Sequence, residues 1–297
     1  MEVKDILITG GTGFIGWQLA QGLAKKRYNV TVLSRNKIDF KIPGIKLLNK
    51  DIIDLKKEDI INFTHIFHFA TATNNSNTVQ SYLDDIKLTS HLLELINYTN
   101  NKIKIIYSSS AGVYGFEKDK KFKETDKLNP LTFYTCSKVA GEDLIKTYSN
   151  KNPNIKHLIF RISNVYGPTQ KEGRLIPDLI SRIKNAKRLE INELTVQNCD
   201  SSRDFIFIDD LVRYLIYLFN FKENSTYNLG SGVSTKVKEV ALIIQKELNQ
   251  NLKIISKNNP NHNCLNIDKL DTEEEIKTLP NQFNLKEGIS IILNYGK

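Results

Sequence analysis

The sequence has little of what would mark a metal-binding, secreted or membrane-spanning protein. Only three of its 297 residues are cysteines, and no two of them stand at the short spacing of a zinc-binding pair: Cys136, Cys199 and Cys264. The longest apolar stretch, Leu211–Phe221, contains Arg213 and is far shorter than the roughly 20 residues that cross a bilayer. The first residues lack the charged start and apolar core of a secretory signal. These absences predict a cytoplasmic protein with free thiols, no metal site and no membrane contact.

The sequence also lacks a concentrated basic segment, although it is basic overall. It holds 42 Lys and Arg residues against 33 Asp and Glu, which gives a formal net charge of +9. The lysines are dispersed among acidic residues, and the densest basic stretch is the short DKKFK at 119–123. A nucleic-acid-binding protein would need a basic face or stripe. We therefore interpret the charge as a solvated surface and expect no nucleic-acid partner, whereas a small phosphate-bearing substrate would suit the same charge.

What the first half of the chain does contain is a regular alternation of short β-branched runs with longer amphipathic stretches. This alternation predicts repeated β-α-β units and an α/β fold with a Rossmann-like, doubly wound parallel sheet. The predicted strands lie at 5–10, 29–34, 65–70, 102–109 and 157–163, with a helix at 14–26. After Pro168 the pattern loosens, and helices are predicted at 175–186, 209–220 and 236–248.

These patterns also predict the domain organisation. An NAD(P)-binding Rossmann domain is expected over residues 1–167, and a smaller, mainly substrate-binding lobe over 168–297. The chain is expected to return to the Rossmann domain at about 203–230. The segment KNNPNHN at 257–263 is predicted to be a loop.

A glycine cluster follows the first predicted strand. Gly10, Gly13 and Gly16 have the spacing G-x-x-G-x-x-G at a strand-to-helix junction, where glycine permits a tight turn and a close approach of phosphate to the backbone. The helix that begins at Phe14 and Ile15 would offer free N–H groups and a partial positive charge to that phosphate. A glycine cluster alone could be a structural turn, but the flanking strand and helix predict a dinucleotide site.

The second predicted strand ends without the usual ribose-binding carboxylate. An Asp or Glu is expected about 20 residues after the glycines, but the sequence has Ser34 followed by Arg35. This pair leaves room and charge for a 2′-phosphate, which favours NADP, with NAD as the alternative. The competing interpretation is that Arg35 is only an exposed loop residue.

A candidate catalytic group lies further along the chain. Tyr134 and Lys138 stand four residues apart in YTCSK, and so share one face of the predicted helix. A neighbouring cation lowers the pKa of a tyrosine, which could then exchange a proton with a sugar hydroxyl or carbonyl. Such a spacing also arises by chance on solvated helices. Here, however, a strand that ends in Ser108, Ser109 and Ser110 precedes it, and these hydroxyls could bond the same substrate oxygen.

Taken together, these segments resemble the extended short-chain dehydrogenase/reductases that act on nucleotide sugars. The resemblance covers nearly the whole chain and rests on motifs in a fixed order: TGGTGFIG, DIID, HFAT, SSSAGVYG, YTCSK, RISNVYGP, RDFIFIDDL and YNLGSG. It implies that Ser110, Tyr134 and Lys138 form the catalytic triad. Sequence position supports a shared site, because parallel sheets bind ligands at the carboxyl ends of their strands, and the candidate residues follow those ends.

The resemblance also implies binding roles. Asp51 and Ile52 would lie beside the adenine, Phe69 and Ala70 would line the cofactor channel, and Lys138 would also bond the nicotinamide ribose. Asn164 and Arg203 would hold the diphosphate of a nucleotide-sugar substrate. A homodimer is expected from the family and from apolar positions on one helix, which could equally face the sheet: Leu83, Ile86, Leu93 and Ile96.

The chain departs from the family pattern at informative positions. Ala111 and Gly112 stand where dehydratases usually carry an acid, so dehydration is disfavoured. Asp85 stands where the family commonly has Asn. His65 and His68, three apart on a predicted strand, point to opposite faces, which argues against a metal site.

The function predicted from the sequence is therefore hydride transfer at C4 of a nucleotide-linked hexose. A 4-keto-sugar reductase is favoured, because Arg35 points to NADP. The alternative is a nucleotide-sugar 4-epimerase, and a remoter one is a dinucleotide-binding sensor without catalysis, against which the intact Ser110, Tyr134 and Lys138 argue.

Overall fold

The chain divides into two compact units in a computed structural model, which describes residues 4–37, 42–72, 77–99, 101–115, 120–257, 269–270 and 283–296. The first unit comprises Met1–Val113, Lys127–Ile162 and Val212–Asn228. The second comprises Tyr114–Asp126, Ser163–Leu211 and Leu229–Lys297. Each unit is thus built from segments that are far apart in the sequence.

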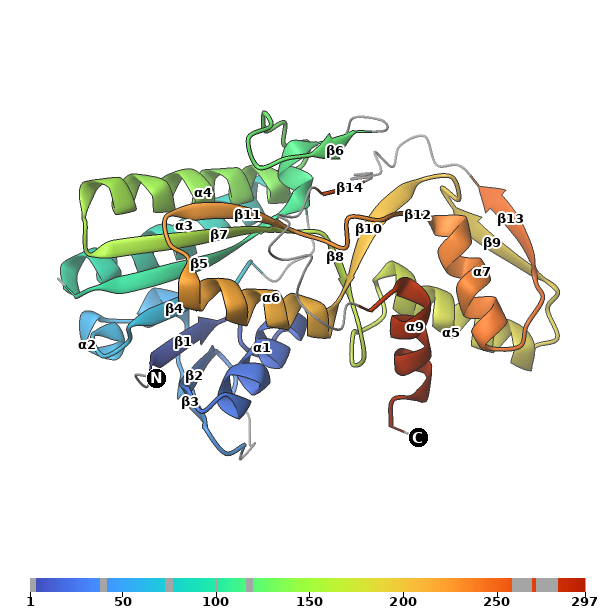
Figure 1. Ribbon diagram of the computed structural model, residues 1–297, viewed down its shortest axis with the longest axis horizontal. Coiled ribbons are helices and arrows are strands. Elements are labelled where there is room, and N and C mark those ends of the chain that lie inside the picture. Colours follow the sequence, from blue (N-terminus) through green and yellow to red (C-terminus); the bar gives the residue numbers. More distant parts are fainter. Residues whose placement is uncertain are drawn as a thin grey trace. The chain divides into compact units, whose positions relative to one another are not determined.

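The first unit is built on a seven-stranded sheet with the strand order β11-β7-β5-β4-β1-β2-β3 (Figure 1). The neighbours from β7 to β3 all pair in parallel. The strands are β1 (Asp5–Thr9), β2 (Asn29–Ser34), β3 (Ile45–Asn49), β4 (His65–His68), β5 (Ile103–Ser110), β7 (Ile155–Ile162) and β11 (Ser225–Leu229). Strand order reverses beside β1, with β4 on one side and β2 on the other, as in a doubly wound sheet.

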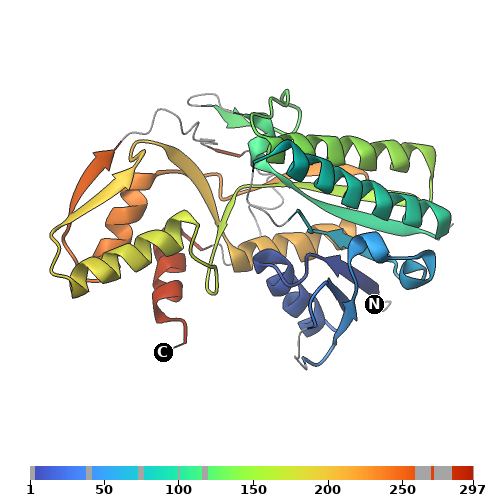
Figure 2. The ribbon, with the colours of Figure 1, turned by 180° about the vertical axis from the view of Figure 1, so that it is seen from behind.

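Helices cover both faces of this sheet. The longer ones are α1 (Phe14–Lys25), α3 (Val79–Thr99), α4 (Phe133–Lys151) and α6 (Ile208–Phe221), and two short ones are η1 (Ile52–Asp54) and α2 (Lys57–Ile60). In the views from the front and from behind, α3 and α4 lie on one face, and α1 and α6 on the other (Figures 1 and 2). The close approach of α1 to α6 occurs at Gly22, where an added Cβ would lie 2.7 Å from Val212 Cγ1.

Burial on both faces explains why the central strands read as nearly continuous apolar runs. Ile6, Leu7 and Ile8 of β1 are all fully buried. Under α3, a cluster of aliphatic side chains includes Leu92, Leu93 and Ile96. Two of the apolar positions proposed for a dimer surface, Leu93 and Ile96, therefore face the core, whereas Leu83 is 51% exposed. The homodimer itself stays a prediction.

The second unit contains small sheets and amphipathic helices. β12-β10-β8 form a three-stranded sheet, and β13-β9 and β14-β6 form pairs. The strands are β6 (Lys121–Phe122), β8 (Asn164–Tyr166), β9 (Glu193–Gln197), β10 (Ser202–Phe207), β12 (Ser234–Lys236), β13 (Lys253–Lys257) and β14 (Lys269–Leu270). The helices are α5 (Leu175–Arg188), α7 (Val237–Glu247) and α9 (Leu285–Asn294), and α9 packs closely enough that a Cβ on Gly288 would overlap Tyr166.

The predicted fold class is confirmed, and the predicted elements match closely. All five predicted strands and the predicted helices are present, with ends that differ by one or two residues. The strand β3 was not predicted, because IKLLN follows Pro43-Gly44 and is only partly buried at the sheet edge. Most of the predicted loop at 257–263 lies outside the described residues. No described helix has the length and apolar character that crossing a membrane requires.

Candidate active site

Four predicted site residues of the first unit lie at one edge of the parallel sheet. Gly10 directly follows β1, Ser34 ends β2, Ala70 comes two residues after β4, and Ser110 ends β5. These strands are neighbours in the order β5-β4-β1-β2. Because they are parallel, their carboxyl ends meet at the same edge, which is where open α/β sheets bind ligands.

The glycine loop is shaped by contacts that leave no space for side chains. Gly10 has φ +67°, and an added Cβ would lie 2.6 Å from the nitrogen of Ala70. A Cβ on Gly16 would lie 2.4 Å from the carbonyl oxygen of Gly10. Glycine at these two positions therefore lets the loop pack on the segment after β4 and lets α1 pack on the loop.

The start of α1 fits an anionic ligand. Its N-cap, Gly13, provides no side-chain hydrogen bond, and the first turn that begins at Phe14 and Ile15 contains no acidic residue. By contrast, Thr132 caps α4 with its side chain. The first N–H groups of α1 and the positive end of its dipole thus remain suited to a phosphate, as the dinucleotide prediction requires.

The two predicted residues at the end of β2 have different surroundings. The Ser34 hydroxyl bonds the backbone of Asn36, with distances of 3.0 and 3.2 Å to its oxygen and nitrogen. Asn49 of β3 donates from Nδ2 to the carbonyl oxygens of both Ser34 and Arg35. Arg35 itself is exposed. Ser34 therefore shapes the turn, and Asn49, which the sequence reasoning missed, fixes the backbone from which Arg35 extends.

The predicted adenine-binding residues follow β3 at the same edge. Asp51 is the N-cap of η1 and accepts a hydrogen bond from the nitrogen of Ile53 at 3.4 Å. Ile52 is buried in the core cluster. At the end of β4, which β1 and β2 separate from β3 in the sheet, Phe69 and Ala70 donate their N–H groups to the carbonyl oxygen and hydroxyl of Thr9. These contacts place the predicted cofactor-lining residues on well-anchored backbone.

The predicted catalytic residues lie on β5 and on the first turns of α4. Thr132 caps α4, so that Tyr134 is in its first turn and Lys138 in its second. Tyr134 is 44% exposed, whereas Lys138 is only 2% exposed. Ser110 ends the adjacent β5, and its Oγ accepts a hydrogen bond from the nitrogen of Gly112 at 3.1 Å. An accessible phenol thus stands over a buried ammonium.

Aromatic rings surround that ammonium. The Nζ of Lys138 lies 5.0 Å from the ring centroid of Tyr107 and 5.6 Å from that of Tyr134, which is within cation–π distance. Tyr107 comes from β5 and packs on Gly141 of α4, where an added Cβ would overlap its hydroxyl. Burial lowers the pKa of Lys138 to about 8, against the opposing charges of Asp85 and Glu142. A lysine with this pKa can change charge near physiological pH.

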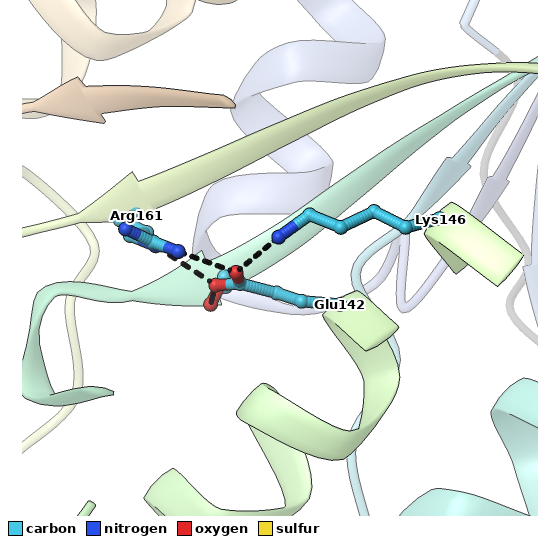
Figure 3. A network of polar contacts seen from close by, with 4 residues as sticks. Glu142, Lys146 and Arg161 are labelled. Carbon is cyan, nitrogen blue, oxygen red and sulfur yellow. Dashed lines mark hydrogen bonds and ion pairs between the residues drawn. The ribbon is translucent and has the colours of Figure 1, made fainter. Parts of the chain in front are cut away.

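A network of polar contacts underlies this part of α4 (Figure 3). Glu142, one turn after Lys138, is fully buried and accepts a hydrogen bond from Ser109 Oγ at 2.5 Å. Lys146 approaches the same carboxylate at 3.4 Å, and Arg161 of β7 completes the network. The network joins β5, α4 and β7 beneath the candidate catalytic residues.

The two histidines of β4 are packed inside the first unit. His68 lies between two hydroxyls, with its Nδ1 2.8 Å from Thr9 Oγ1 and its Nε2 3.1 Å from Thr89 Oγ1. His65 packs edge-on against Phe219. Within the part of the chain that the structure describes, no cluster of three His, Cys, Asp or Glu residues could hold a metal ion.

The two predicted substrate-binding residues belong to the second unit. Asn164 begins β8 and donates from Nδ2 to the carbonyl oxygen of Asp204 at 3.1 Å, across to β10. Arg203 lies on β10, and its Nε is buried without a hydrogen-bond partner among the described residues. Asp204 is occupied by the N–H groups of Ser231 and Gly232. Arg203 thus holds a donor that a ligand could satisfy.

Comparison with known proteins agrees with this architecture. The parallel sheet with its glycine loop defines a Rossmann-like dinucleotide-binding fold. The chain belongs to the NAD dependent epimerase/dehydratase family, whose model matches residues 6–230.

Several relatives are similar over most of their length. A Methanocaldococcus jannaschii protein that is provisionally named UDP-glucose 4-epimerase is 31% identical, and the match covers 98% of both chains. The CDP-abequose synthase of Salmonella muenchen is 30% identical, over 84% of this chain and 83% of that protein. TunA, an NAD-dependent NDP-hexosamine 5,6-dehydratase of tunicamycin biosynthesis, is 30% identical in sequence. Its structure matches with a TM-score of 0.83, over 98% of this chain and 96% of TunA. The UDP-glucose 4-epimerase of Thermotoga maritima shares the fold. The two chains are 22% identical, and their structures match with a TM-score of 0.84 over 98% of each chain.

Proposed function

We propose that this protein transfers a hydride between a nicotinamide dinucleotide and C4 of a nucleotide-linked hexose. The observation that carries the proposal is the pairing of an accessible Tyr134 with the buried ammonium of Lys138 on one helix face. Both residues belong to the unit that contains the glycine loop. A bound NAD(P) would supply the hydride donor or acceptor.

Each catalytic side chain has a role that follows from its chemistry. Tyr134 would carry the proton between the sugar oxygen and solvent, since its phenol is exposed and a neighbouring cation favours the phenolate. Ser110 would hydrogen-bond the same sugar oxygen. Lys138 would stabilise the phenolate electrostatically, and its ammonium would bond the ribose of the nicotinamide.

The nucleotide part of the substrate would be held by the second unit. The buried Nε of Arg203 and the amide of Asn164 are the groups that we assign to its diphosphate. The guanidinium of an arginine can bond two phosphate oxygens at once, whereas a lysine ammonium acts as a point charge. Arg203 is therefore the principal diphosphate contact that we propose. The +9 net charge would aid the approach of such an anion.

For the direction of the chemistry, we favour reduction of a 4-keto sugar with NADPH. Arg35 follows a β2 end that lacks a carboxylate, and Asn49 anchors the backbone carbonyls of Ser34 and Arg35. A guanidinium at this position suits a 2′-phosphate, and a reductase must exchange its cofactor in every cycle. The absence of an acid at Ala111 and Gly112 argues against dehydration.

A second candidate is 4-epimerisation with a retained NAD. It is favoured by the names of relatives, among them the Methanocaldococcus jannaschii protein at 31% identity. An epimerase takes a hydride from C4 and returns it to the opposite face, so that no cofactor is consumed.

The decisive experiment uses wild type and Tyr134→Phe. The purified protein is analysed for copurified NAD or NADP, and UDP-, dTDP-, CDP- and GDP-sugars are then screened for NADPH oxidation or epimer exchange. We expect Tyr134→Phe to lose turnover by at least about 100-fold while binding cofactor as wild type does, because only the proton-carrying oxygen is removed. A variant rate within a few-fold of wild type would contradict the assignment and would favour a non-catalytic dinucleotide sensor.

A further inference from the structure

Asp85 of α3 connects two segments that carry predicted site residues. Its Oδ1 accepts a hydrogen bond from the nitrogen of Ala72 at 2.5 Å, in the segment that follows Ala70. Its Oδ2 lies 2.8 Å from the hydroxyl oxygen of Ser137, the residue before Lys138. Both partners are donors, so both oxygens of the carboxylate act as acceptors.

Ser137 passes this connection on to Tyr134. Its hydroxyl oxygen is also 2.8 Å from the carbonyl oxygen of Tyr134, one turn earlier in α4. The single hydroxyl proton is therefore shared by two acceptors, of which the carboxylate is the stronger. Asp85 thus fixes the turn of α4 that runs from Tyr134 to Lys138.

The charge of Asp85 is not cancelled by its partners. Ala72 and Ser137 are neutral, and within the described residues Asp85 has no cation at salt-bridge distance. The other carboxylate near Lys138, that of Glu142, is already paired with Arg161. Of the two carboxylates whose charges act on Lys138, Asp85 is therefore the one that has only neutral hydrogen-bond partners.

The remaining groups around Lys138 do not provide negative charge. His68 of β4 has its pKa lowered to about 3 by burial and by the charge of Lys138, so it stays neutral. Tyr107 of β5 has its pKa raised well above the usual value by burial, so it keeps its proton. Tyr134 is the group whose proton is used. The charges of Asp85 and Glu142 both raise the pKa of Lys138, while burial lowers it.

We propose that Asp85 is a positioning residue of the reaction, which holds the Tyr134–Lys138 turn in place and supplies the negative charge that keeps Lys138 an ammonium. This inference rests on the proposed roles of Tyr134 and Lys138. It does not depend on the sugar or on the direction of hydride transfer.

The first test measures the charge of Lys138 directly, without substrate. The protein is labelled with ¹³Cε-lysine, the Lys138 signal is assigned by its loss in Lys138→Arg, and its titration is followed by NMR. In Asp85→Asn we expect the midpoint to fall by about one pH unit, the lower end of the effect of a close opposite charge. In Asp85→Glu, which keeps the charge, it should stay within a few tenths of wild type.

Asp84→Asn is the matched control. Asp84 lies on the same helix, one residue earlier, and its Oδ1 accepts a hydrogen bond from Gln80. This variant removes the same charge but does not touch Ser137 or Ala72, so the Lys138 midpoint should not move. An unchanged midpoint in Asp85→Asn, or an equal shift in Asp84→Asn, would overturn the proposal. If Asp85→Asn does not fold, Asp85→Ser is judged by the same criterion.

The second test is the pH–rate profile. If the Lys138 midpoint is one pH unit lower, about fivefold less of this side chain is an ammonium at pH 8. The alkaline limb of the pH–rate profile should therefore lie at lower pH in Asp85→Asn than in wild type. A merely structural role would lower the rate equally at all pH values and would contradict the proposal. If wild type turns over no nucleotide sugar, the proposed function fails, whereas the NMR titration still decides the role of Asp85.

Discussion

Glu142 of α4 and Arg161 of β7 form a bidentate ion pair that is buried away from solvent. Arg161 donates from Nε to Oε1 at 3.0 Å and from one terminal nitrogen to Oε2 at 2.7 Å (Figure 3). The side chains are 0% and 4% exposed. Because Ser109 of β5 also donates to this carboxylate, the pair fixes α4 to the sheet one turn away from Lys138.

Loss of one partner should be costly, because it leaves a buried charge uncompensated. We expect Glu142→Gln to lower the free energy of unfolding by about 3–5 kcal/mol, measured by urea denaturation at pH 7. Lys146→Ala is the control, since Lys146 reaches the same carboxylate from a partly exposed position and should cost less than about 1 kcal/mol. A similar small loss for both variants would show that the buried pair contributes little.

Buried histidines should make the protein less stable in acid. Burial lowers the pKa of His65 and of His68 to about 3, and that of His157 to about 4. In the unfolded chain a histidine titrates near pH 6.5, so between about pH 6 and 4 the unfolded state binds more protons. Each of these histidines therefore stabilises the folded state fully only above about pH 6.5, the pKa of histidine in the unfolded chain. Below that pH the free energy of unfolding falls by about 1.4 kcal/mol per pH unit for each such histidine.

The measurement is a series of urea unfolding curves from pH 7 to pH 4. His65→Phe should reduce the slope of unfolding free energy against pH by about one proton, because phenylalanine does not titrate and its ring can keep the edge-on contact with Phe219, while the bond of Nδ1 to Thr64 Oγ1 is lost. His91→Phe is the comparison, since His91 is only partly buried and its Nε2 lies 3.2 Å from the carbonyl oxygen of Leu55. A wild-type curve that is flat over this range would show that the histidines titrate alike in both states.

The diphosphate assignment of Arg203 can be tested without turnover. Arg203→Ala should weaken the binding of a nucleoside diphosphate by about 10- to 150-fold, the equivalent of about 1.5–3 kcal/mol for a charge-assisted contact. Isothermal calorimetry with UDP, dTDP, CDP and GDP measures this effect. Arg182→Ala is the control, because Arg182 belongs to the same unit, is exposed, and donates to the carbonyl of Thr195. Unchanged affinity in Arg203→Ala would indicate that Arg203 serves the local packing of β10 instead.

Much of the fold could be predicted from the sequence because its information is local. The apolar runs of β1, β4 and β5 identify central strands that are buried on both faces, and the glycines that follow β1 identify the loop. Strand β3 escaped prediction because an edge strand needs few buried residues, and IKLLN has none that is fully buried.

The candidate site was predicted only in part, because its supporting contacts span long distances in the sequence. Tyr134 and Lys138 are visible as a spacing of four. The bond from Ser137 to Asp85 joins residues that are 52 positions apart, and that from Asn49 to Arg35 crosses from one strand to the next. Asp85 was visible only as a departure from the family pattern, and its contacts became clear once α3 and α4 were packed together.

The choice between reduction and epimerisation depends on Arg35. A reductase consumes a hydride in each cycle, and cells supply biosynthetic hydride chiefly as NADPH, whereas an epimerase gains from retaining NAD. If Arg35 binds the 2′-phosphate, Arg35→Ala should raise the Kd for NADPH by about 10- to 150-fold and leave that for NADH nearly unchanged. Lys37→Ala is the matched control, since Lys37 is an exposed cation two residues further along the chain.

The cofactor that the protein retains then decides the chemistry. A reductase should be purified with little bound cofactor, should prefer NADPH over NADH, and should lose that preference in Arg35→Ala but keep it in Lys37→Ala. Its NADPH oxidation should match the 4-keto sugar reduced, mole for mole. If the protein is instead purified with one NAD per chain and interconverts 4-epimers without oxidising added NADPH, the reductase proposal is wrong. Arg35 would then be an exposed residue of the β2 turn, and the 4-epimerase would be the function of this site.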